Sequence, residues 1–135
     1  MSRYCLDTSA YSQFKRGESE VTNLIDQADW IGVPSIVIGE LTVGLLSGAQ
    51  RARNEDELAE FLGDPVVNEI LVDREVARIY AEIVMALRRA GTPLPTNDIW
   101  IAAASARVGS PVLTFDEHFR SVGRIGTILL RAPPE

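Results

Sequence analysis

The sequence has few of the residues that most often build redox, zinc and nucleophilic sites. It contains one cysteine, Cys5, and one histidine, His118, which excludes an intrachain disulfide and a zinc site made of several such ligands. It also lacks the G-x-x-x-x-G-K-[ST] and G-x-G-x-x-G loops that bind nucleotide phosphates. Ser9 is not part of a G-x-S-x-G turn, and with His118 as the only available base a serine triad is not supported.

Long apolar runs are absent as well. Glycine, proline or an acid interrupts each run well before the roughly 20 residues that are needed to span a bilayer. Asp7 interrupts the first apolar segment before a secretory leader could form. Together with the single cysteine, these features predict a cytoplasmic protein with no membrane contact.

The composition is that of an ordinary globular domain, and we expect one domain over residues 1–135. Hydrophobic residues make up 46% of the chain and charged residues 24%. The net charge of -6 argues against a protein that holds nucleic acid by bulk electrostatics alone. It does not exclude a nucleic-acid substrate, because a metal ion held by carboxylates would offset their charge and attract phosphate.

Short apolar segments alternate with helical patterns along the chain. This alternation predicts an α/β domain with a central parallel sheet of about five strands between helices. In such sheets, ligands bind beyond the carboxyl ends of the strands. The five expected strands cover residues 3–6, 30–33, 69–72, 111–114 and 128–130.

Four acids stand where the predicted strands end or the helices begin. Asp7 follows the first strand and Asp116 the fourth, while Asp98 lies in the first turn of a helix. Each of these three also has a structural interpretation, as a helix cap or a turn residue. Glu40 lies in an apolar helix predicted over residues 35–48, which we expect to be largely buried, so this acid needs a partner or a raised pKa.

Acids that are distant in sequence and meet at one sheet edge usually hold a cation. Magnesium and manganese prefer oxygen ligands, which carboxylates supply without histidine. We expect Asp7, Asp98 and Asp116 to hold the metal, and Glu40 to bind it through water or to orient the nucleophile. The pattern predicts a metal-dependent hydrolase of phosphodiesters. Asp73, between a strand and a helix, is interpreted as a cap only, and His118 as a surface residue.

Four motifs in order, LDTSAY, IVIGEL, NDIWIAAAS and LTFDEHF, resemble those of PIN-domain ribonucleases, most closely the VapC toxins of bacterial toxin–antitoxin pairs. The resemblance covers essentially the whole chain. It implies a single PIN domain that cleaves RNA with Mg²⁺, or alternatively Mn²⁺, as cofactor. By position, it implies a catalytic quartet of Asp7, Glu40, Asp98 and Asp116, supported by the polar residues Ser9 and Thr114.

The resemblance also implies a partner. A small VapB-type antitoxin would bind DNA with one end and wrap the toxin with the other. The toxin would form a homodimer, which would form a higher oligomer with the antitoxin. An arginine of the partner would enter the acidic pocket. The amphipathic stretches 21–28 and 41–46 are candidate surfaces for dimerisation and antitoxin docking, but both could equally face the sheet.

Three other interpretations share the acidic sheet edge. A PIN nuclease of RNA processing would have the same catalytic residues without being a toxin. A magnesium-binding receiver domain needs a lysine after its fifth strand, yet Lys15 is the only lysine in the chain. A haloacid-dehalogenase-like phosphatase needs a second aspartate where Ser9 stands.

Overall fold

A parallel sheet of five strands lies at the centre of the computed structural model, which describes residues 1–131. Every neighbouring pair of strands runs parallel, and their spatial order is β3-β2-β1-β4-β5. The predicted α/β class and central parallel sheet are confirmed. The strands are β1 (Arg3–Leu6), β2 (Trp30–Pro34), β3 (Val67–Ile70), β4 (Val112–Thr114) and β5 (Thr127–Leu129).

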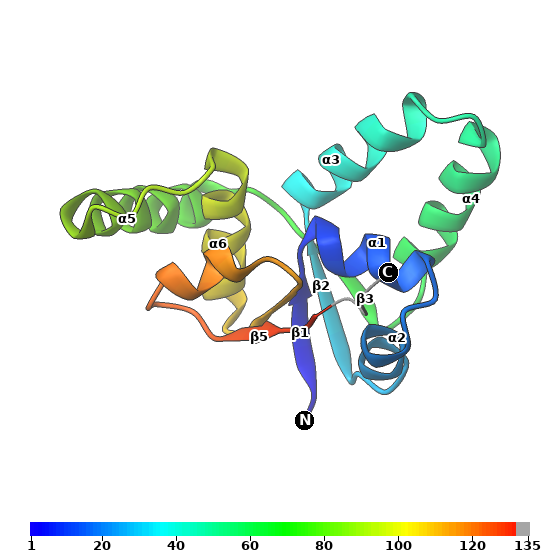
Figure 1. Cartoon of the computed structure of the whole chain (residues 1–135), viewed down its shortest axis with the longest axis horizontal. Coiled ribbons are helices and arrows are strands. Elements are labelled where there is room, and N and C mark those ends of the chain that lie inside the picture. Colours follow the sequence, from blue (N-terminus) through cyan, green and yellow to red (C-terminus); the bar gives the residue numbers. More distant parts are fainter. Residues whose placement is uncertain (132–135) are drawn as a thin grey trace.

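Helices cover both faces of this sheet (Figure 1). The strand order changes direction between β1 and β4, and right-handed crossovers then place the helices before and after that point on opposite faces. In Figure 1, α5 and α6 lie to the left of the sheet and α1 to α4 to its right. The helices are α1 (Thr8–Lys15), α2 (Ser19–Asp26), α3 (Ser35–Leu46), α4 (Arg51–Leu62), α5 (Arg74–Ala90), α6 (Thr96–Val108) and the 3-10 helix η1 (Glu117–Ser121).

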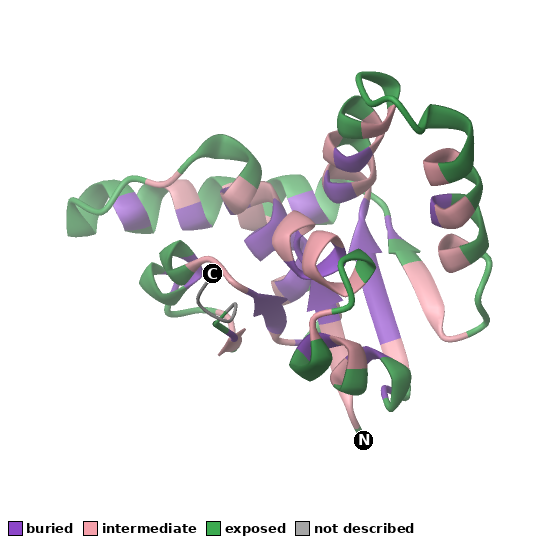
Figure 2. Ribbon diagram, turned by 45° about the vertical axis from the view of Figure 1, so that its right-hand side comes forward, coloured by how far each residue is buried: buried purple, intermediate pink, exposed green. Residues whose placement is uncertain are grey.

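The core lies between the central strands and the helices that pack on them (Figure 2). Leu6 of β1, Ile31 of β2 and Leu113 of β4 are completely buried. Helix α6 places Ala102 and Ala103 against the sheet, also completely buried, and such small side chains let a helix approach its neighbours closely. Within the described residues, no helix combines the length and the apolar character needed to cross a membrane.

The structure corrects the predicted position of the third strand. Strand β3 covers Val67–Ile70 rather than residues 69–72, because its register with β2 pairs Ile31 with Val67. Leu71 and Val72 are exposed on the connection to α5, although they are apolar. The predicted domain bounds of 1–135 include residues 132–135, which lie outside the described residues.

The helix predicted over residues 35–48 and the amphipathic stretch 21–28 differ in how far their apolar side chains are buried. Helix α3 is not largely buried: Val37 and Leu41 face the core, whereas Val43 is 69% exposed and Leu46 48% exposed. The prediction is wrong because α3 and α4 project beyond the sheet as a pair, so only one side of α3 meets the core (Figure 1). The apolar residues of the stretch 21–28 point inward instead, so that stretch offers little apolar docking surface.

We predict that Gly32→Ala destabilises the fold. A Cβ atom at Gly32 would lie 2.6 Å from Cδ1 of Ile70 and 2.6 Å from the Trp30 ring, so both side chains must move. We expect a loss of about 1–3 kcal/mol, which is typical of overpacking, in the free energy of unfolding measured with urea. Gly39→Ala in α3 is the control: a Cβ there meets nothing within 4 Å, and we expect a gain of about 0.5–1 kcal/mol. Equal stability of the two variants would contradict the packing of β2 on β3.

Candidate active site

Asp7 lies at the carboxyl end of β1 and is almost completely buried, with 4% of its surface exposed. Its Oδ1 accepts a hydrogen bond from the amide of Ala10 at 2.9 Å, which caps the first turn of α1. The hydroxyl of Ser9 lies 2.8 and 2.9 Å from the two carboxylate oxygens. Thr114 of β4 donates its hydroxyl to Oδ2. Asp7 is therefore both a helix cap and the centre of a polar cluster at the sheet edge.

Ser9 and Thr114 also fix the segment that follows β4. The Ser9 hydroxyl accepts the amide of Phe115 at 3.0 Å, and the Thr114 hydroxyl accepts the amide of Asp116 at 2.9 Å. Each hydroxyl thus contacts Asp7 on one side and the backbone after β4 on the other. The two residues predicted as supports hold Asp7 and Asp116 in a fixed relation.

The pKa of Asp7 is raised above its ordinary value, mainly because burial disfavours the charged carboxylate. The hydrogen bonds from Thr114, Ala10 and Ser9 oppose this effect, and the negative charge of Asp116 adds to it. The raised pKa means that the hydrogen-bond donors around the Asp7 carboxylate replace its lost hydration only in part.

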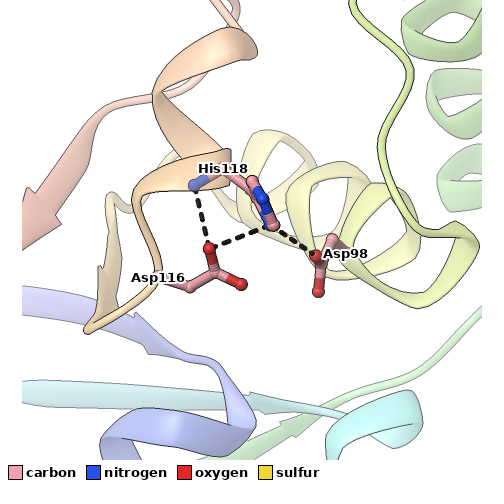
Figure 3. A group of neighbouring side chains, drawn as sticks. All are labelled: Asp98, Asp116 and His118. Atoms are coloured by element: carbon pink, nitrogen blue, oxygen red, sulfur yellow. Dashed lines mark hydrogen bonds and ion pairs between the residues drawn. The ribbon is translucent and has the colours of Figure 1, made fainter.

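Asp98 and Asp116 approach each other from α6 and from the turn after β4, and His118 lies beside both (Figure 3). Oδ1 of Asp116 accepts the amide of His118 at 2.9 Å, which begins η1. Nδ1 of His118 lies 3.1 Å from Oδ1 of Asp116 and 4.0 Å from Oδ2 of Asp98. The His118 side chain is 57% exposed, as a surface residue should be, but its ring is turned toward the acids. The sequence interpretation missed this contact.

The other three predicted acids all influence the pKa of Asp98. Burial is the largest cause that raises the pKa of Asp98 from 3.8 to about 6. The negative charges of Asp116, Asp7 and Glu40 raise this pKa further, and His118 opposes them. At the carboxyl edge of the sheet, where the strand order changes direction, the structure places Asp98 and Asp116 in one close group with His118. Asp7 and Glu40 lie outside that group but near enough to act on Asp98.

Glu40 reaches this region from α3 and is held by neutral donors. Thr8 donates its hydroxyl to Oε1 at 2.7 Å, and the side-chain amide of Asn97 lies 3.3 Å from Oε2. Sequence reasoning expected a partner for Glu40 but did not identify it. A signal was available, because Thr8 directly follows Asp7 and Asn97 directly precedes Asp98.

A groove of about 670 Å³ opens beside Glu40, between α1, α3 and α4. Thr8 and Glu40 lie at the end that adjoins the acids, and Lys15 and Arg53 belong to the same lining. Both basic side chains pair with Glu57, at 3.0 and 3.3 Å. Of the four acids, Glu40 lines this groove, whose other lining residues are both polar and apolar.

Comparison with known proteins identifies the family. The family model described as "PIN domain" matches residues 4–125. The chain belongs to the PIN-domain family. This PIN domain is 30% identical over 117 residues to Ribonuclease VapC5 of Mycobacterium tuberculosis, covering 87% of this chain and 85% of that protein. It is 28% identical over 102 residues to Ribonuclease VapC4 of the same organism, covering 76% and 78% of the two chains.

Solved structures have the same PIN-domain fold. VapBC-5 from Mycobacterium tuberculosis matches with a TM-score of 0.72 and 28% identity, covering 98% of this chain and 100% of that one. VapBC2 from Rickettsia felis, solved with a promoter DNA fragment, matches with a TM-score of 0.85 at 20% identity, covering 95% and 98%. At 20% identity, the second match supports the fold alone.

The raised pKa of Asp98 predicts how the stability of the metal-free protein changes with pH. In the unfolded chain this carboxyl loses its proton near 3.8, but in the folded protein only near 6. The folded state therefore holds more protons in this window, so its stability falls as the pH rises from about 4 to about 6. We expect the melting temperature of the wild type, relative to Asp98→Asn, to fall across that window. Parallel melting curves at every pH would contradict the prediction.

Proposed function

We propose that this protein is a VapC-type toxin, a metal-dependent endoribonuclease that a VapB-type antitoxin silences. The observation that carries the proposal is the hydrogen-bonded arrangement of the acids at one sheet edge, in a chain similar to Ribonuclease VapC5. Thr114 joins Asp7 to Asp116, and Glu40 contacts Thr8 and Asn97, the neighbours of Asp7 and Asp98. Membership of the PIN-domain family leaves the receiver and phosphatase interpretations without support. A PIN nuclease of RNA processing is the alternative. Co-purification of the protein with an antitoxin would decide against that alternative.

The donor set fits a divalent metal ion. Carboxylate oxygens are the ligands that Mg²⁺ and Mn²⁺ prefer, and the mutual repulsion that raises the pKa of Asp98 would be relieved by a cation. Asp7, Asp98 and Asp116 would hold the ion, which we take to be Mg²⁺, with Mn²⁺ as the alternative. When bound, such an ion supplies a Lewis acid for the phosphoryl oxygen and lowers the pKa of an attacking water.

The protein residues contribute position and proton transfer. Asp7 is fixed by three donors and cannot turn away from the site, so it orients whatever the acids bind. Glu40 is held only by the neutral Thr8 and Asn97, so its carboxylate is free to accept a proton from a water molecule at the mouth of the groove. In this proposal, RNA enters through that groove and presents its phosphodiester to the acids.

Helix α3 supports a protein partner. Val43 and Leu46 expose apolar surface on α3, on a different side of the helix from Leu41 and Leu45, which line the groove. Neighbouring exposed apolar side chains on one helix are typical of interaction sites. We assign this surface to the antitoxin, in agreement with the predicted stretch 41–46, while the homodimer implied by the resemblance stays a prediction.

We predict that Asp7→Asn abolishes RNA cleavage and leaves the fold intact. Asparagine caps helices about as well as aspartate but cannot supply a negatively charged ligand. The assay uses partner-free protein and structured RNA with Mg²⁺ or Mn²⁺, and circular dichroism checks the fold. Asp73→Asn is a matched control, because Asp73 caps α5 by accepting the amide of Val76 at the same 2.9 Å. Full activity in Asp7→Asn, or equal loss in Asp73→Asn, would count against the proposed site.

We further predict that Leu46→Glu separates partner binding from catalysis. Leu46 is 48% exposed at the end of α3, so a charged side chain there disturbs a docked apolar surface without opening the core. We expect antitoxin affinity to fall at least about tenfold, which corresponds to roughly 1.4 kcal/mol, with unchanged RNA cleavage by the free protein. Titration calorimetry measures the affinity. Wild-type affinity in this variant would place the docking surface elsewhere.

A further inference from the structure

His118 is placed as a metal ligand would be, although the acidic quartet does not include it. One ligand atom each of Asp98, Asp116 and His118 lies within 4.8 Å of the others. Figure 3 shows the three side chains converging from α6 and from the turn into η1. In the described part of the chain, this is the group of histidine, cysteine and acidic residues whose ligand atoms lie this close together, and Asp7, the third proposed carboxylate ligand, is outside it.

The two distances from His118 to the acids are compatible with a shared ion. With bonds of about 2.1 Å, neighbouring ligands of an octahedron lie roughly 3 Å apart and opposite ligands about 4.2 Å apart. Nδ1 of His118 lies 3.1 Å from the Asp116 oxygen and 4.0 Å from the Asp98 oxygen, within this range.

The backbone that carries His118 is held firmly. Its amide donates to Oδ1 of Asp116 at 2.9 Å, so the histidine and the acid are fixed to each other by a capping bond. The next residue, Phe119, is completely buried and anchors η1 in the core. A loosely held surface histidine would have neither constraint.

We propose that His118 is a nitrogen ligand of the divalent ion, beside Asp98 and Asp116, and that it makes the site favour Mn²⁺ over Mg²⁺. The inference rests on the proposed metal-dependent nuclease and adds a fifth residue to its site. Magnesium strongly prefers oxygen, whereas imidazole binds transition metals well, so an imidazole ligand gives the transition ion an advantage that carboxylates alone do not. The competing explanation is that His118 only donates a hydrogen bond to Asp116.

A nitrogen ligand can be detected directly, because the chain has one histidine. Tag-free protein is loaded with Mn²⁺, and electron spin echo modulation measures the coupling of the ion to ¹⁴N of imidazole. We expect this coupling in the wild type and in the control Glu117→Gln, whose side chain lies on the same short helix. We expect it to be absent in His118→Gln. Calorimetry of the same proteins should show Mn²⁺ affinity about tenfold lower in His118→Gln, and Mg²⁺ affinity changed by less than about threefold.

The outcomes separate the two proposals. Mn²⁺ binding without imidazole coupling, or equal losses of Mn²⁺ and Mg²⁺ affinity in His118→Gln, would overturn the role of His118 and leave the nuclease proposal standing. If neither ion binds the wild type, the metal-dependent nuclease itself is overturned, and the role of His118 with it.

Discussion

The buried carboxylate of Asp7 is the constraint on which the rest of the site depends. An ionised carboxylate removed from water costs several kcal/mol unless donors surround it. The donors come from the first turn of α1 and from Thr114 of β4, so satisfying this one group joins β1, α1 and β4 where the strand order changes direction. The Thr114 hydroxyl that donates to Asp7 also accepts the amide of Asp116. The second acid is therefore placed by the hydrogen bonds that stabilise the first.

The other charges are arranged with little local compensation. Glu40 has neutral partners, and the pKa of Asp98 is raised both by burial and by the neighbouring acids. Among residues 1–131, His118 is the group whose charge opposes this shift, and a histidine carries a positive charge only when protonated. A fold under selection for stability alone would place an arginine here. Keeping the repulsion instead leaves the site ready for a cation, because binding one gains the energy that arginine would have supplied.

The sequence predicts the parts of this structure that local patterns determine. Asp7 and Asp73 are recognisable as caps between a strand and a helix, and both cap their helices. The register of β3 was mispredicted because an apolar segment of this length fits several pairings, and only its contacts with β2 select one. Thr8 and His118 were missed although each stands within two residues of a predicted acid, because only the fold shows that Thr8 contacts Glu40 of α3 and that the His118 ring turns toward Asp116 and Asp98.

Helix α3 links the chemistry of the site to the exposed apolar surface. Glu40 and Val43 are three residues apart, so their side chains lie on adjacent turns, roughly 5–6 Å apart at Cβ. A partner that covers Val43 must therefore come within one helical turn of Glu40 and of the groove that adjoins it. In the proposed complex, a partner that covers Val43 would therefore also lie close to Glu40, so the geometry of one helix would join docking to the loss of access to this acid.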